Sequence, residues 1–497
     1  MHAADVEQRA GTGLTDRSEH AVVVGASMAG MLAARVLADH FERVTVIEPD
    51  TFPDRPEPRK GTPQDLHLHI LLARGRESLQ RYFPGLGEEL IAAGAPVVDV
   101  ANDLISLTPA GWEVRFHSDL EFLSFSRSLL DHHVRQRLAA FERVRFLQGR
   151  AVEGLIAGKA GAGVSGVWLR SRTSPAEGDA SVGGSARERH APAEDATDEP
   201  LYADLVVDAS GRGSRLPRWL ADLGYGATPQ STVDAHLGYA SRIYEIPAGF
   251  EADWRGAIIR AAPPENKRGG VVLPIENGRW LVSLAGGDRD YPPTDDEGFL
   301  QFTGTLQSSR LYDALKEAEP LTQAQAYRGT RNRLNHFERL PRWPEGLVAL
   351  GDSVCAFNPI YGQGMTNAAL GAEELEGFLD RPHGPGAGEL LSGKRHSFTG
   401  RFQRSLAAIN RASWSLASNE DHSYESTDSS DGAGPDLAST MMRPYFRAVG
   451  RLTTYDIYTR RVLLRVYNML DRPTALLGPR IIVRVIKQKI KAKGGRR

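Results

Sequence analysis

Short, continuous apolar runs recur along the chain. They cover residues 21–24, 44–47, 205–207 and 347–350. Apolar runs of this length are typical of strands buried on both faces of a parallel sheet. The first run is followed by a small-residue turn and a helical pattern that places Met31, Ala34 and Leu37 on one face. Strand, turn, helix and strand in this order predict an α/β core around a parallel sheet.

A different pattern, rich in strand-forming residues, occupies 103–125 and 232–330. The strand-like runs are residues 104–107, 112–116, 240–244, 270–275, 280–284 and 324–328. The first two runs are separated by a Pro-Ala-Gly turn, and Asn277-Gly278 is the dipeptide favoured in two-residue hairpins. We therefore expect a mostly antiparallel sheet inserted into the α/β core.

Beyond Pro382 the pattern is helical and is interrupted by an acidic, serine-rich loop, 418–438. Residues 459–491 alternate Arg or Lys with Leu, Val and Ile, and 480–497 hold eight basic residues and no acidic one. We prefer the interpretation that this segment packs an apolar stripe on the core. The alternatives are contact with the inner face of an anionic membrane or with an acidic carrier protein.

Composition narrows the class of protein. Across 497 residues the net charge is -2, which gives no basic surface for nucleic acid. The single cysteine, Cys355, excludes an intramolecular disulfide and suits the cytoplasm, and we expect it to be a packing residue rather than a catalytic thiol. Residues 1–19 predict a disordered tail rather than a signal peptide, and 171–199 an exposed, mobile hairpin tip. No apolar run is long enough to cross a membrane.

The first candidate site is the turn after residues 21–24. Gly25, Ser27 and Gly30 occupy the three fixed positions of a Gly-x-Gly-x-x-Gly fingerprint, with Met28 inside it, and Glu48 ends the second strand. An acid at this offset binds ribose hydroxyls and favours an unphosphorylated ribose, as in FAD or NAD. Ser27 replaces the glycine that normally admits the pyrophosphate, although its hydroxyl could donate to a phosphate.

The second candidate site follows the last apolar run. Asp352 lies just past a strand end, where it could accept hydrogen bonds from sugar or ribityl hydroxyls. Pro359, Gly362 and Gly364 leave backbone N–H groups free to face a ligand at the start of a helix expected near Met365. A tight turn without a ligand is the alternative, and the upstream nucleotide motif favours a flavin site.

With a third turn at 208–215, these elements resemble the class A flavoprotein monooxygenases, the para-hydroxybenzoate hydroxylase-like family, from residue 20 to about 380. The resemblance implies a discontinuous Rossmann-like FAD-binding core, an inserted β-sheet substrate domain and a C-terminal helical region. The FAD domain is 20–102, 126–231 and 331–380, the substrate domain is 103–125 and 232–330, and the helical region with its basic tail is 381–497.

The resemblance also assigns roles to residues. It puts Gly25, Ser27, Gly30 and Glu48 on the ADP half of FAD, Arg59 and Lys60 beside the flavin or its ribityl chain, Arg127 near the pyrophosphate, Asp352 on the ribityl and pyrophosphate, and 362–366 against the isoalloxazine. Asp208 lies in an Ala-Ser-Gly turn where many hydroxylases have Gly-Ala-Asp-Gly. It therefore either contacts the cofactor or only supports the loop.

By the same resemblance the protein is an FAD-dependent monooxygenase that transfers one oxygen atom from O2, through a flavin C4a-hydroperoxide, to an alkene or an aromatic ring. Residues 59–72 look like the bacterial natural-product branch with polyether epoxidases and polyketide hydroxylases. The implied partners are an apolar polyketide or terpenoid substrate and NADPH or NADH, used directly or through a flavin reductase. No catalytic residue is assigned, and Tyr239, Arg242, Tyr244 and Arg328 are candidates for the pocket wall.

Three alternatives remain. A flavin-dependent reductase of isoprenoid-type double bonds would use the same FAD site, and a scaffold that has lost its redox activity would keep the fold alone. A flavin-dependent halogenase is disfavoured because its Trp-x-Trp-x-Ile-Pro motif is missing. His67 and His69 are two residues apart and have no cysteine or third clustered acidic residue beside them, which disfavours a metal site. We expect one of them to pack against the flavin loop.

Overall fold

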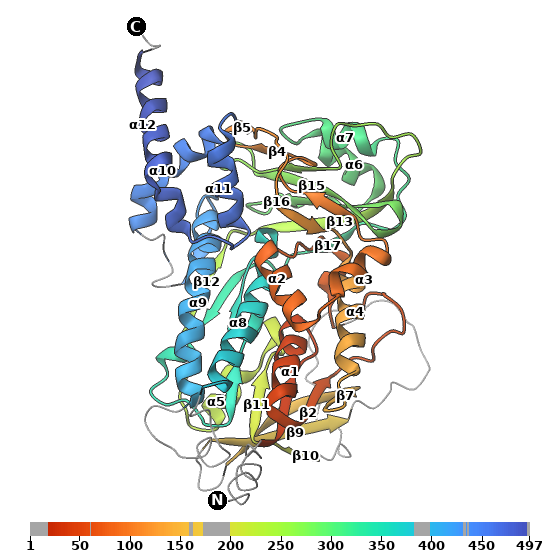
Figure 1. Cartoon of the computed structure of the whole chain (residues 1–497), viewed down its shortest axis with the longest axis vertical. Coiled ribbons are helices and arrows are strands. Elements are labelled where there is room, and N and C mark those ends of the chain that lie inside the picture. Colours follow the sequence, from red (N-terminus) through yellow and green to blue (C-terminus); the bar gives the residue numbers. More distant parts are fainter. Residues whose placement is uncertain are drawn as a thin grey trace, which may run out of the picture.

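The computed structural model describes residues 18–59, 61–158, 163–171, 199–381, 398–430, 434 and 437–494. Lys60, nearly all of the 1–19 segment and the centre of the 171–199 segment lie outside these residues. Figure 1 shows a parallel sheet at one end of the molecule, a larger sheet at the other end, and the C-terminal helices beside the larger sheet.

The α/β core is built on a five-stranded parallel sheet. Its strands, in sheet order, are β19 (Leu347–Ala349), β11 (Leu205–Asp208), β1 (Ser18–Val24), β2 (Phe41–Glu48) and β7 (Val144–Gln148). All four predicted apolar runs are strands of this sheet, which confirms the α/β prediction. Because β2 and β11 flank β1 on opposite sides, the strand order reverses at β1, and the carboxyl edge there is where such folds bind ligands.

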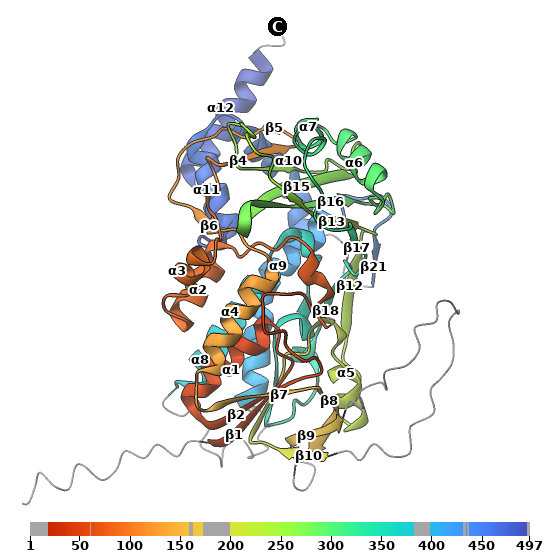
Figure 2. The same ribbon diagram turned by 90° about the vertical axis from the view of Figure 1, so that its right-hand side faces the viewer.

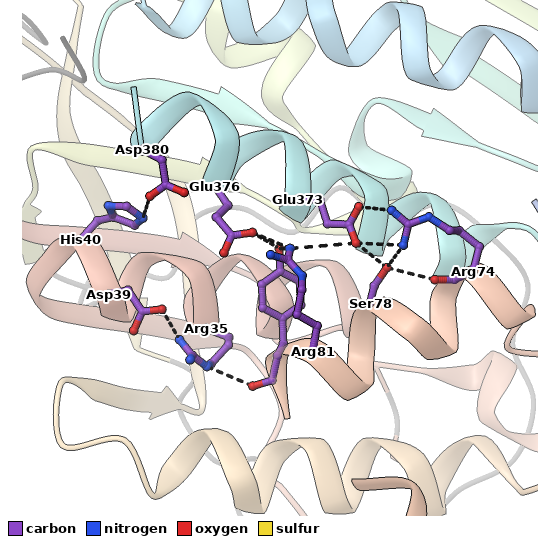
Figure 3. Close-up of polar contacts among 10 residues, drawn as sticks. Arg35, Asp39, His40, Arg74, Ser78, Arg81, Glu373, Glu376 and Asp380 are labelled. Carbon is purple, nitrogen blue, oxygen red and sulfur yellow. Dashed lines mark hydrogen bonds and ion pairs between the residues drawn. The ribbon is translucent and has the colours of Figure 1, made fainter. Parts of the chain in front are cut away.

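Helices cover the core sheet and bind to one another. They are α1 (Met28–His40), α2 (Ala73–Tyr82), α3 (Leu86–Ala92), α4 (Arg127–Ala139), α5 (Leu216–Asp222) and α8 (Gly364–Leu379). Figure 3 shows how polar side chains fasten α2 to α8. Arg74 Nη1 donates to Glu373 Oε1 over 3.0 Å, and Tyr82 Oη donates to Glu376 over 2.9 Å. These contacts hold α8, which carries one candidate site, in a fixed position.

The larger sheet has seven described strands and is mostly antiparallel. In order they are β17 (Gln325–Tyr327), β13 (Gly238–Glu245), β16 (Arg279–Gly286), β15 (Arg268–Ile275), β14 (Gly256–Ile259), β4 (Leu104–Thr108) and β5 (Gly111–Trp112). The hairpin β4-β5 thus belongs to the same sheet as strands that lie more than a hundred residues later in the chain. Asn277 and Gly278 adopt φ of 64° and 66° between β15 and β16, as the hairpin signal predicts.

Two expected boundaries are wrong. The predicted strand 112–116 ends at Trp112, and the N–H of Val114 instead donates to Thr453 O, which belongs to the C-terminal region. The predicted loop 418–438 begins later, because α9 (Phe398–Asp421) continues through its first residues. In both places a long-range contact determines the structure: at the second, buried Asp421 accepts hydrogen bonds from the side-chain amides of Asn332 and Asn358.

Smaller sheets complete the described strands. They are β10-β9-β8 (Glu199–Tyr202, Val164–Ser171, Arg150–Ala157), β20-β18-β12-β21 (Cys355–Ala356, Asn332–Asn335, Gln230–Asp234, Asp428–Ser429) and β3-β6 (Val97–Asp99, Glu121–Leu123). The sheet β10-β9-β8 contacts β2 and β11 of the core. The sheet β20-β18-β12-β21 lies between the two larger sheets in Figure 2.

The C-terminal helices α10 (Leu437–Leu452), α11 (Ile457–Tyr467) and α12 (Pro479–Gly494) form their own apolar cluster. Arg460, fully buried on α11, donates to Ala101 O over 3.1 Å and lies 3.5 Å from Glu113, which ties this cluster to the early hairpin. Among the helices of the described ranges, none is long and apolar enough to cross a membrane.

Candidate functional site

The turn between β1 and α1 requires glycine at two positions. Gly25 has a φ of +98°, and a Cβ there would lie 2.6 Å from Ala209 O. A Cβ on Gly30 would lie 1.9 Å from Gly25 O. The helix therefore begins tightly against the strand end. Ser27 stands at the N-cap position without a side-chain capping bond, and no acid lies in the first turn, so the first N–H groups of α1 are available to an anion.

Glu48 lies directly beside this turn. Its carboxylate accepts hydrogen bonds from Ala26 N over 2.9 Å and from Asp50 N over 3.2 Å. Arg59 Nη1 lies 3.1 Å from the same carboxylate, and Arg59 Nη2 donates to Ala26 O over 3.1 Å. The resemblance places Arg59 beside the flavin or its ribityl chain. In the structure Arg59 pairs with two neighbouring carboxylates, Glu48 and Asp50, and its assignment to the flavin stays a prediction.

Asp352 lies at the same sheet edge, next to the start of α1. A short 3-10 turn, Gly351–Ser353, follows β19, and a Cβ on Gly351 would lie 2.6 Å from Ala29 Cβ. Among the described residues, none donates a hydrogen bond to the Asp352 carboxylate. Burial raises the pKa of Asp352, and the positive charges of Arg212 and Arg333 oppose that rise. A half-buried carboxylate among arginines suits a ligand with both hydroxyl and phosphate groups.

The turn into α8 contains buried polar atoms that lack partners. Gln363, at the N-cap position, makes no capping bond. The buried Thr366 Oγ1, Gln363 Oε1 and Asn367 Nδ2 find no hydrogen-bond partner among the described residues. Such unpaired polar atoms are rare inside folded proteins, because each loses its hydrogen bonds to water on burial. Two of these side chains face neighbouring helices: a Cβ on Gly75 of α2 would lie 2.7 Å from Thr366 Oγ1, and Asn367 Oδ1 accepts from Ser413 Oγ over 3.2 Å. The features that fit FAD are therefore the first N–H groups of α1 and the Asp352 carboxylate, which suit its phosphate and hydroxyl groups.

Several predicted site residues contribute only backbone. The side chains of Met28 and Met365 are buried in the main apolar core, so only their main-chain groups can face a ligand. Pro359 lies in a short 3-10 turn, Pro359–Tyr361, whose start is fixed by Asn358 Oδ1 accepting from Ile360 N over 3.3 Å. Gly362 and Gly364 follow it and lead into α8.

Asp208 and Arg127 have contrasting surroundings. The Asp208 carboxylate accepts from Ser210 Oγ over 2.5 Å and from Ser214 Oγ over 2.6 Å, so its described contacts all lie within its own turn. Arg127 begins α4, is buried, and pairs with Asp131 over 2.8 Å. Burial lowers the pKa of Arg127, but the negative charges of Asp131, Asp65 and Asp352 outweigh burial and raise that pKa.

An aromatic cluster connects the larger sheet to this site. His67 packs edge-on against Tyr239, with ring centroids 4.8 Å apart, and lies 5.5 Å from Tyr327. Its Nδ1 is 2.9 Å from Ser241 Oγ, which in turn lies 2.6 Å from Ser283 Oγ. Burial lowers the pKa of His67 to about 4, so the ring is neutral at neutral pH. Burial raises the pKa of Tyr327, the charge of Arg212 opposes that rise, and the charge of Asp352 adds to it.

Only one of the four candidate wall residues belongs to this cluster. Successive strand residues face opposite sides of a sheet, and Tyr239 faces His67. Arg242 and Tyr244 are on the other side of β13, where Arg242 Nη2 lies 2.8 Å from Asp296 and Tyr244 packs in the cluster under α6 (Asp296–Gly304) and α7 (Arg310–Leu315). Arg328 stacks over Tyr291 at 4.5 Å.

Three residues of the candidate site and its aromatic cluster were not predicted from the sequence. They are Arg212, Ser241 and Tyr327. Strand alternation is the signal that could have found Ser241, since it shares a face with Tyr239 two residues before it. Cys355 is buried beside Phe357, and burial raises its pKa, as expected of a packing residue. Within the described ranges, no group of three or more His, Cys, Asp or Glu side chains could hold a metal.

Comparison with known proteins gives the family. No protein-family model matches the sequence. Over 379 residues, which are 75% of this chain and 76% of the relative, the sequence is 36% identical to Protein Rv3254 of Mycobacterium tuberculosis. The chain belongs to the family of that mycobacterial protein. Family membership covers three quarters of the chain and fixes no reaction by itself.

Solved structures show which fold the family has. The flavin-dependent brominase Bmp2 aligns with a TM-score of 0.62 and 14% identity, over 95% of this chain and all of Bmp2 (100%). PqsL of Pseudomonas aeruginosa, a probable FAD-dependent monooxygenase, aligns with a TM-score of 0.57 and 16% identity, over 82% and 97% of the two chains. The myxobacterial halogenase CndH gives 0.57 and 14%, over 91% and 97%. This family therefore has the fold of flavin-dependent halogenases and monooxygenases.

Proposed function

We propose that this protein binds FAD across the carboxyl edge of its parallel sheet and acts as an FAD-dependent monooxygenase. One observation carries the proposal: the starts of α1 and α8 both lie beside the turn that carries Asp352, and Glu48 bonds to the turn before α1. A Cβ on Gly351 would lie 2.6 Å from Ala29 Cβ, and a Cβ on Gly364 would lie 3.9 Å from Asp352 Oδ1. Helix N-termini bind phosphate, and carboxylates accept hydrogen bonds from sugar hydroxyls. That combination matches the pyrophosphate, ribose and ribityl groups of FAD.

Bound FAD would supply electron transfer and the activation of oxygen. The residues of the chain would do the positioning. Glu48 would hold the adenosine ribose, and the first N–H groups of α1 would hold the pyrophosphate. Asp352 would hold the ribityl chain, and the backbone of residues 362–366 would face the ring system, where backbone donors stabilise developing negative charge.

The larger sheet would hold the substrate on the side that carries Tyr239, Ser241 and Tyr327. Apolar side chains of the neighbouring cluster, including Leu273 and Phe122, would exclude water from the reacting groups. His67, with a pKa of about 4, is a weak base at neutral pH and suits the role of a neutral hydrogen-bond partner. Epoxidation of an alkene needs no base, whereas hydroxylation of a phenol gains from one, so both outcomes belong to the proposal.

We further propose an apolar polyketide or terpenoid as substrate and NADPH or NADH as electron donor, used directly or through a flavin reductase.

The test of the proposed function begins with the purified protein. A yellow preparation with one FAD per chain is expected, and a protein that is colourless and binds no added FAD contradicts the proposal. With a nicotinamide donor, a candidate alkene or phenol and isotopically labelled O2, one labelled oxygen atom should enter the product.

Two other products would assign a different reaction to the same fold. A saturated product without label would indicate a reductase of isoprenoid-type double bonds. A product that depends on bromide or chloride would indicate a halogenase, although the sequence lacks the Trp-x-Trp-x-Ile-Pro motif.

A further inference from the structure

The C-terminal helix α12 presents apolar side chains on two sides. Ile481 and Val485 are only 1% and 3% exposed and pack with α10 and α11. On the same side Arg484 Nε donates to Asp456 over 2.9 Å. This side is fixed to the protein and accounts for part of the apolar pattern in the sequence.

The other side carries a second apolar stripe. Its members, Ile482, Val483, Ile486 and Ile490, are 38%, 48%, 51% and 65% exposed. At about 100° per residue, the four positions fall within roughly 100° of one another around the helix and turn away from the packed side. Exposed aliphatic side chains gathered into one stripe, rather than scattered singly, mark an interaction surface.

Basic residues border this outward stripe. By the same helical geometry, Arg480, Lys487 and Lys491 lie along one edge and Lys489 along the other, and all four are exposed. No acidic residue occurs in α12. An apolar stripe between Lys and Arg side chains is typical of helices that lie in the headgroup region of an anionic bilayer.

We propose that the outward stripe of α12 and its bordering basic residues dock this protein on an anionic lipid surface. The helix has 16 residues, so at about 1.5 Å per residue it lies along a membrane rather than across it. Figures 1 and 2 show α12 extending away from the rest of the molecule, where a flat surface can reach it. The single sign of its charge favours anionic lipid over a second copy of α12, which would bring like charges together.

Vesicle sedimentation with the full-length protein tests the proposal. We expect pelleting with vesicles that contain phosphatidylserine, much less with phosphatidylcholine alone, and release by salt. The triple variant I482Q/I486Q/I490Q keeps charge and helix propensity but loses the stripe, and K487Q/K491Q loses charge. Each lost charge should weaken binding about fivefold. The matched control is I91Q/L321Q, which alters two side chains on the body that are 47% and 44% exposed.

Loss of binding in both α12 variants, with the control still bound, supports the proposal. The proposal fails if the unmodified protein pellets with neither kind of vesicle, or if the α12 variants pellet as well as it does. It also fails if the unmodified protein is a dimer that I482Q/I486Q/I490Q converts to a monomer, since a second copy then covers the stripe. Circular dichroism and the melting temperature check that each variant remains folded.

Discussion

The two ends of the candidate site are built in different ways. The nucleotide end, formed by Gly25, Gly30 and Glu48, comes from one continuous unit of strand, turn, helix and strand, and the Ala26 N–H already bonds to Glu48. The reaction end is formed by Asp352, the start of α8 and the cluster of His67, Tyr239 and Tyr327, which different regions of the chain supply. Backbone geometry therefore determines the first end, and tertiary packing determines the second.

The strongest test of the nucleotide end is G30V. No rearrangement of flexible side chains can relieve a Cβ 1.9 Å from Gly25 O, so we expect the variant to lose FAD and about 3 kcal/mol or more of stability. Thermal unfolding and flavin retention measure both. The matched control is G377V, on the same kind of helical backbone, where a Cβ meets no other atom within 4 Å. Equal behaviour of the two variants would contradict a backbone-determined nucleotide end.

The second prediction is that acid lowers the free energy of unfolding by protonating the histidines of the reaction end. Burial lowers the pKa of His67 to about 4 and that of His69 to about 3, so the unfolded chain takes up these protons first, near the ordinary histidine value of about 6.5. The stability that these neutral rings contribute is therefore present above about pH 6.5 and is lost as pH falls, by up to about 3 kcal/mol for His67 as pH falls below about 4. We expect H67Q/H69Q to flatten the stability curve in this window, measured as a difference from the unmodified protein.

Stability against pH must be compared as variant minus unmodified protein, because a buried acidic residue changes stability with pH in the opposite direction from the two histidines. Burial raises the pKa of Asp421 to about 7, so its contribution is lost as pH rises from about 4 to about 7. The variant D421N should remove that part of the curve and leave the histidine part unchanged. An exposed histidine, His117, provides the control H117Q, which should change neither part. Parallel curves for all the proteins would contradict the assignment of burial to His67 and His69.

These contrasts also explain what could be predicted from sequence. The local structure of the nucleotide end, a strand, turn, helix and strand, was predictable because its residues are close together in the chain and follow the alternation typical of that unit. Arg212 was missed although it lies in the 208–215 turn, because that turn was interpreted through Asp208, and Tyr327 was missed because it lies in no local motif. The charge effects that link both side chains to Asp352 depend on long-range packing. The pairing of Arg59 with Glu48 and Asp50 could not be predicted from sequence, because it depends on how the segment after β2 folds back on the strand end. The predicted division into domains stays a prediction.

A third prediction compares the two ends through affinity for FAD. Asp352 accepts no described hydrogen bond and is therefore free for ribityl hydroxyls, so D352N should weaken FAD binding by about 10- to 100-fold, as expected for one lost charged hydrogen bond. Titration of the apoprotein with FAD, followed by flavin fluorescence, measures the change. The control is D222N, because the Asp222 side chain is 65% exposed and pairs only loosely with Arg218, at 3.7 Å. Unchanged affinity in D352N would exclude Asp352 from the FAD site.

The smallest expected effect distinguishes side chains that act on the substrate from those that bind the cofactor within the reaction end. Tyr327 and Tyr244 are both tyrosines of the larger sheet, but half-buried Tyr327 faces His67, whereas buried Tyr244 packs against Phe299 of α6. We expect Y327F to lower turnover or the yield of oxygenated product about tenfold, the effect of one hydrogen bond, without changing affinity for FAD. Y244F should leave both quantities unchanged, because its hydroxyl lies on the other side of the sheet. If the two variants lose activity equally, the face of β13 and β17 toward His67 is not the substrate face, and the comparison between the two ends holds only for the cofactor.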